Sequence, residues 1–148
     1  MSTENQPSEA APTPPSHEML PLISLGVEHV FDTLSREPVF HPTLLALTDD
    51  GQRGMWTLPD LAPDGAAQAL SEITPRPARA VAVFDGEMQT PDGPRPAVAI
   101  EAFEAGALTS TRLVIEYVPG VPGTDLTARV AGDPHVVANG PNPLFGQL

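Results

Sequence analysis

Residues 79–118 read RAVAVFDGEMQTPDGPRPAVAIEAFEAGALTSTRLVIEYV, and this stretch decides the fold. Its apolar runs are rich in Val, Ile and Ala, and they are separated by Gly, Pro and Asp, the residues that favour turns. Consecutive strands joined by short turns form an antiparallel meander. The stretch therefore predicts three neighbouring strands of one antiparallel sheet.

The first two runs of the meander are apolar at every central position. Residues 80–84 read AVAVF and residues 97–100 read AVAI. Successive side chains of a strand point to opposite faces of the sheet, so both faces of these strands need a cover. In the first run Val81 and Val83 share one face, whereas the alanines beside them share the other face with Phe84.

Upstream of the meander the sequence predicts a helix, a hairpin and a second helix. In residues 20–35 apolar side chains recur every three or four positions, which is typical of an amphipathic helix. Residues 43–48 (TLLALT) and 53–58 (RGMWTL) are strand-like and flank an Asp-Asp-Gly turn at residues 49–51. Residues 66–73 (AAQALSEI) predict a short helix whose alanines allow close packing on a sheet.

The remaining segments complete an α+β chain. Residues 126–131 (LTARVA) predict a further edge strand, and residues 132–148 predict a Pro/Gly-rich, irregular C-terminal tail. Residues 1–17 predict a tail that is disordered or held by a partner, which leaves residues 18–131 as a single domain. We expect an α+β fold with a single antiparallel sheet of about five or six strands and two helices packed on one face, in the order α-β-β-α-β-β-β(-β).

With both helices on one face, the other face of the sheet needs a cover. A second copy of the chain, a foreign subunit and the chain's own tail are the three candidates. The tail carries adjacent Leu and Phe residues in an otherwise polar, Pro/Gly-rich sequence, which is typical of an anchor for a groove. The predicted partner-binding residues are therefore Leu144, Phe145, Val81 and Val83.

The charge of the chain excludes several classes of partner. The formal net charge of the 148 residues is −12. A field of this sign repels phosphate backbones and anionic lipid headgroups, so we expect neither nucleic acid nor membrane among the partners. We expect no signal peptide, because the first twenty residues lack a basic region and an apolar core. We expect no membrane-spanning segment, because no run of about twenty apolar residues occurs, and hence a cytoplasmic location.

Missing residue types exclude several kinds of chemistry. The chain has no cysteine, which rules out a thiol nucleophile, a disulfide and a thiolate zinc site. It has no lysine, which rules out a Schiff base and a phosphate-loop lysine. No nucleophile motif and no glycine-rich phosphate loop occurs, so we assign no catalytic residue and no cofactor.

Two weak groups of candidate site residues remain. His29, Asp32 and His41 are the candidates for a metal site, although no two histidines stand at a spacing that favours shared ligation. Acid–base chemistry needs carboxylates in different environments, and the meander offers Asp85, Glu87, Glu101 and Glu104. The ordinary interpretations are a solvated helix face and a solvated strand end.

These observations favour a non-enzymatic function. We expect an acidic protein-interaction subunit or accessory factor that acts through its sheet face, its terminal tails or both, with a protein partner or as a homo-oligomer. The alternative is a small-ligand-binding or metal-dependent enzyme with a pocket between the first helix and the sheet, where His29 and His41 would contribute. A weaker third interpretation is an acidic surface that mimics nucleic acid and occupies a basic partner.

Overall fold

The computed structural model describes residues 13–36, 40–48, 50–57, 65–73, 77–121 and 124–144. Its elements, in chain order, are η2 (His17–Met19), α1 (Leu20–Arg36), β1 (Thr43–Leu47), β2 (Arg53–Thr57), α2 (Ala66–Ser71), β3 (Arg79–Thr90), β4 (Gly93–Glu104), β5 (Ser110–Val118), β6 (Arg129–Val130) and β7 (His135–Gly140). The predicted helices, hairpin, meander and edge strand are all present. No helix in the described part of the chain is long and apolar enough to cross a membrane.

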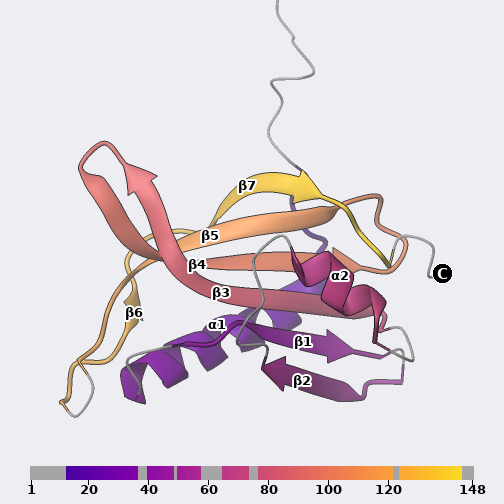
Figure 1. The fold of residues 1–148 in the computed structure, drawn as a ribbon, viewed down its shortest axis with the longest axis horizontal. Coiled ribbons are helices and arrows are strands. Elements are labelled where there is room, and N and C mark those ends of the chain that lie inside the picture. Colours follow the sequence, from indigo (N-terminus) through magenta and orange to yellow (C-terminus); the bar gives the residue numbers. More distant parts are fainter. Residues whose placement is uncertain are drawn as a thin grey trace, which may run out of the picture.

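The strands form one antiparallel sheet, as predicted (Figure 1). Its order is β2-β1-β3-β4-β5-β6, and β7 pairs with the same strand β5 as β6 does. The sheet has seven strands, more than expected, because β7 lies in residues 132–148, where the sequence predicted an irregular tail. Among the described strands, β2 ends the sheet on one side, and β6 and β7 end it on the other.

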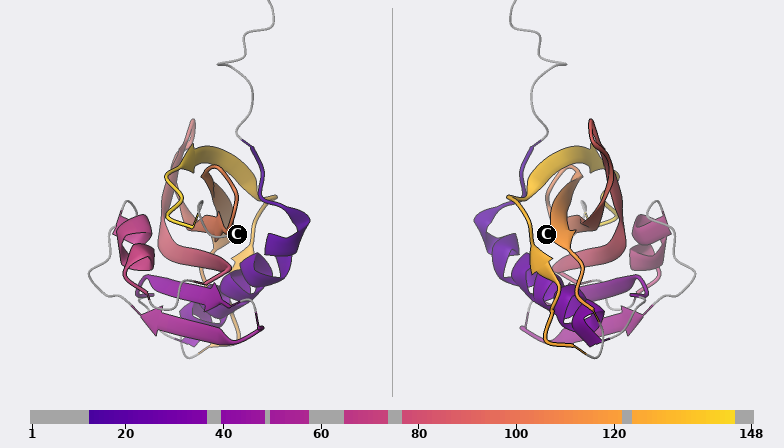
Figure 2. Two further views of the ribbon diagram at one scale, coloured as in Figure 1. Left: turned by 90° about the vertical axis from the view of Figure 1, so that its right-hand side faces the viewer. Right: turned by 90° about the vertical axis from the view of Figure 1, so that its left-hand side faces the viewer.

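The two helices lie on opposite faces of the sheet, so the prediction that both pack on one face was wrong. Figure 1 shows α2 in front of the sheet and α1 behind it, and the side views of Figure 2 show the sheet between them. Each helix belongs to a separate group of buried apolar residues. The physical reason is the apolar character of both faces of β3 and β4, since each face needs its own cover.

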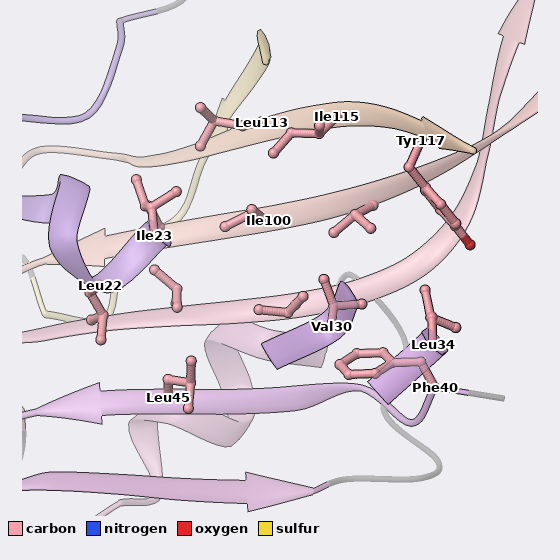
Figure 3. Packing of buried hydrophobic residues seen from close by; sticks show 14 of the residues in the cluster. Leu22, Ile23, Val30, Leu34, Phe40, Leu45, Ile100, Leu113, Ile115 and Tyr117 are labelled. Carbon is pink, nitrogen blue, oxygen red and sulfur yellow. The ribbon is translucent and has the colours of Figure 1, made fainter. Parts of the chain in front are cut away.

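The first core lies between α1 and the sheet (Figure 3). The buried stripe of α1 packs on the valines and isoleucines of β3, β4 and β5. The helix lies close to the sheet at Gly26, where an added Cβ would come within 3.0 Å of Cγ2 of Val83. The main members of this first core are Leu22, Ile23, Val30, Leu34, Phe40, Leu45, Val81, Val83, Val98, Ile100, Leu113, Ile115 and Tyr117.

The second core covers the opposite face and is built from smaller side chains. Ala66 and Leu70 of α2 pack over the alanines of β3, together with Phe103 of β4. Leu144 from the C-terminal segment is fully buried in the same core. The chain therefore covers both faces of its meander with its own residues.

β3 and β4 continue beyond the sheet as a two-stranded arm, which projects from the body in Figure 1. The arm runs through exposed and half-exposed positions to the turn before Gly93, which has a positive φ of 112°. Pro94 and Pro96 lack the N–H that an added strand would need on the β4 side of the arm. This edge is therefore protected against pairing.

Candidate functional site

Strand β2 is an edge strand with large apolar side chains exposed. It pairs with β1 alone among the described strands. Four of its five residues are exposed, including Met55 at 56% and Trp56 at 38%. Proteins usually protect such an edge with proline, lysine or a bulge, and β2 carries none of these.

The β1–β2 hairpin fixes which backbone groups of β2 face outward. The Thr48 N–H donates to the Gln52 carbonyl at 2.9 Å, and the Gly51 N–H donates to the Thr48 carbonyl at 3.0 Å. Gly51 has φ +87°, a conformation that glycine adopts without strain and that closes a three-residue hairpin loop. Thr48 and Gln52 are thus a hydrogen-bonded pair, and such pairs alternate along an antiparallel ladder.

The alternation assigns a direction to every backbone group of β2. Gly54 and Trp56 lie an even number of positions from Gln52, so their N–H and C=O groups point to β1. Arg53, Met55 and Thr57 lie between them, so their N–H and C=O groups point to the open edge. β2 therefore presents a row of backbone donors and acceptors that β1 leaves unused.

The side chains of β2 divide between the two faces of the sheet. Met55 lies opposite Leu45, which belongs to the core under α1. Trp56 lies opposite Leu44, which belongs to the core under α2. The indole ring covers Gly54, because a Cβ built there would lie 2.6 Å from Cη2 of Trp56. A larger residue at position 54 would clash with the Trp56 ring, so this position requires glycine. An aromatic ring that shields a strand glycine is a known arrangement in sheets.

A shallow hollow of about 220 Å³ lies between α1 and β2. It is lined by Leu25, His29, Leu45, Arg53, Gly54 and Met55. The ring of His29 contacts Phe40 edge-on, with centroids 5.6 Å apart. Arg53 has no ion-pair partner within the described part of the chain. The hollow is thus an apolar groove with two nitrogen-bearing side chains at its border, and it adjoins the open edge of β2.

The predicted partner-binding residues lie inside the domain. Val81 and Val83 are fully buried beneath α1, and Leu144 is fully buried in the second core. Phe145 lies outside the described residues. The three buried side chains therefore stabilise this chain and are not accessible at its surface.

The predicted metal candidates do not form a group. His29 contacts Phe40, Asp32 forms an ion pair of 2.7 Å with Arg36, and His41 is exposed. Within the described ranges no three His, Asp or Glu side chains are close enough to hold a metal ion.

The carboxylates of the meander are also kept apart. Glu104 bonds to Ser16 and lies 3.7 Å from Arg79, whereas Glu87 is exposed on the arm. Asp85 accepts a 2.5 Å hydrogen bond from the Tyr117 hydroxyl. Burial, and then the bond to Asp85, raises the pKa of Tyr117 well above its ordinary value of 10.0.

Glu101 is buried in a polar cluster on the α2 side of the sheet. One carboxylate oxygen accepts from the Arg112 guanidinium, at 2.8 Å from Nε, and the other accepts from the Ser110 hydroxyl. Gly140 of β7 passes directly over this cluster, since a Cβ there would lie 3.1 Å from the Ser110 hydroxyl. A cavity of about 210 Å³ adjoins it, but both oxygens of Glu101 are already satisfied. The cluster therefore joins β4, β5 and β7.

Sequence reasoning missed the β2 edge as a site. The position of a strand within a sheet depends on pairings between distant segments, and no local pattern reports it. The sequence RGMWT of residues 53–57 was the one indication of an unprotected edge, because it has two large apolar side chains and no carboxylate or proline.

Comparison of the chain with protein-family models, with curated proteins and with solved structures found no match.

Proposed function

We propose that this chain is a non-enzymatic, acidic protein-interaction subunit that joins another polypeptide by strand addition at β2. The observation that carries the proposal is the edge of β2, where Arg53, Met55 and Thr57 direct outward backbone groups that no described strand pairs with. An added strand would satisfy these groups and extend the sheet.

The hollow beside β2 supports the same function. In strand addition, main-chain hydrogen bonds supply affinity and pockets for alternate side chains supply specificity. A residue opposite Met55 would place its side chain on the α1 face, beside Leu25 and His29. The groove thus accepts an apolar side chain of the added strand.

Proline substitution tests the proposal by removing a single backbone N–H group. The Met55 N–H points outward, so Met55→Pro removes a donor that the added strand needs and leaves the bonds to β1 intact. The matched control is Met55→Leu, which keeps both the N–H and an apolar side chain. We expect native mass spectrometry after mild purification to show an assembly for the wild type and for Met55→Leu.

The Met55→Pro chain should appear alone in the same experiment, with an unchanged circular dichroism spectrum. An assembly that survives Met55→Pro, or a wild-type chain without any polypeptide partner, would contradict the proposal.

Binding of a small ligand in the same hollow is the second candidate function. His29 and Arg53 lie at the border of about 220 Å³ of space, which suits a small molecule with an apolar body and an anionic group. This function predicts a rise in melting temperature with such a compound, and His29→Ala should abolish the rise. No rise with any of a panel of small carboxylates and phosphates would count against it.

A further inference from the structure

We propose that the strand added at β2 is β2 of a second copy of this chain, in a symmetric antiparallel pair centred on Met55. This inference rests on the proposed function and names its partner. Directly opposed residues of an antiparallel pair share a face, so a two-fold axis normal to the sheet places one residue opposite itself.

The outward backbone groups limit where the axis can lie. The axis lies at a hydrogen-bonded pair if it is centred on Arg53, Met55 or Thr57, whose N–H and C=O groups point to the edge. Centred on Gly54 or Trp56 it would lie at a non-hydrogen-bonded pair and would leave one end of β2 unpaired. Centring on Arg53 would oppose two guanidinium groups, and centring on Thr57 would leave most of the strand unpaired. Centring on Met55 pairs all five residues of β2, with Arg53 opposite Thr57.

The side chains of β2 are complementary to themselves in this register. Gly54 of one copy lies opposite Trp56 of the other, on the α2 face. Such a pair lies between hydrogen-bonded pairs, where opposed Cα atoms are only about 4.5 Å apart. The Trp56 ring of each copy already lies over its own Gly54, so in this register the two indole rings meet each other across the pair. On the α1 face the two Met55 side chains meet beside the hollows of both copies.

Charge favours this edge for contact between two copies. β2 has no carboxylate and carries one arginine, although the net charge of the chain is −12. Two copies can therefore approach at β2 without opposing carboxylates on the strands. Repulsion between the remaining charges is screened by salt, so salt should strengthen this pairing, whereas it would weaken the binding of a basic foreign partner.

The size of the contact predicts a reversible dimer. Stable interfaces bury about 1,200–2,000 Å² in total, and two strands of five residues bury less than this. The exposed surface of Met55 and Trp56 supplies most of the apolar contact. We expect half-dissociation at about 1 to 100 μM, the range of weak homodimers.

Cysteine cross-linking tests the register directly, because the chain has no cysteine of its own. A hydrogen-bonded antiparallel pair places opposed Cα atoms about 5.5 Å apart, which suits a disulfide. Under mild oxidation Met55→Cys should give a linked dimer. Arg53→Cys and Thr57→Cys should each stay unlinked alone and should link when mixed.

Leu108→Cys serves as the control for random collision, because Leu108 lies on the β4–β5 turn with 75% exposure. Linking of Met55→Cys at the rate of Leu108→Cys, or equal linking of every variant, would overturn the proposed register.

The wild-type chain, the cysteine variants and Met55→Pro together distinguish a failure of self-pairing from a failure of strand addition in general. If the wild-type chain is monomeric and no register-specific link forms, but Met55→Pro still abolishes a complex with a foreign protein, self-pairing is wrong and strand addition stands. If Met55→Pro abolishes no complex of either kind, both are wrong.

Discussion

At the scale of single residues, most polar groups of the described chain serve the fold. Glu101 is neutralised by Arg112 and bonded by Ser110, so its burial on the sheet is compensated. Tyr117 extends from the first core to reach Asp85 at the base of the arm. Sequence spacing placed Asp85 and Glu101 on adjacent strands, but it could not show that each already has a partner.

The Glu101–Arg112 pair should show strong coupling. Glu101 is buried and Arg112 is partly exposed, so Arg112→Leu leaves a buried carboxylate without its counter-ion and should lower the free energy of unfolding by about 1 to 3 kcal/mol. The double variant Glu101→Leu/Arg112→Leu should be less destabilised than this single variant, because it leaves no buried charge. Urea denaturation of Arg112→Leu, Glu101→Leu and the double variant measures the coupling, and a double variant that shows the sum of the two single losses would contradict the pairing.

Tyr117 offers a spectroscopic test, since it is the only tyrosine. Its pKa is raised by burial first and by the bond to Asp85 second, so its absorbance should titrate well above 10.0 in the folded chain. The neutral phenol is favoured in the folded state, so this contribution to stability is complete below pH 10.0 and declines above it as the unfolded chain ionises.

Asp85→Asn should lower the midpoint of this titration and leave it above 10.0, because the burial remains. A midpoint at 10.0 in the folded wild type would show that the hydroxyl is solvated.

At the scale of elements, local patterns predicted what forms, and tertiary pairing decided where it lies. The period of α1 and the turns around β1, β2 and the meander are encoded within short windows of sequence. The face taken by α2 is not, because both faces of β3 are apolar. β7 escaped prediction because its Gly- and Pro-flanked sequence becomes a strand only through pairing with β5.

The C-terminal segment is an element of the core. Asn142 Nδ2 donates to the carbonyls of Glu104 and Ala107 at 2.9 and 2.7 Å, and Leu144 inserts beneath α2. Leu144→Ala should therefore lower the free energy of unfolding by about 2 to 5 kcal/mol. Urea denaturation checks this loss, with the exposed Leu126→Ala as a control that should change little. Unchanged stability of Leu144→Ala would mean that the side chain serves a surface outside the core.

At the scale of the whole molecule, helices cover both faces of the sheet, and large apolar side chains of β2 stay exposed at one edge. An interaction surface on a sheet face would follow only if both helices lay on the same face. With the helices on opposite faces, we propose that the interaction surface lies at β2, where Met55 and Trp56 are exposed. In the proposed dimer, the net charge of −12 on each copy makes the pairing depend on salt.

Sedimentation equilibrium of the wild-type chain, at about 0.05 M and about 0.5 M NaCl, tests self-pairing at β2 most directly. We predict a monomer–dimer equilibrium over about 1 to 100 μM that shifts toward the dimer at the higher salt concentration. Met55→Pro should sediment as a monomer under every condition. A wild-type chain with the mass of one copy at all concentrations and both salt concentrations would contradict the account.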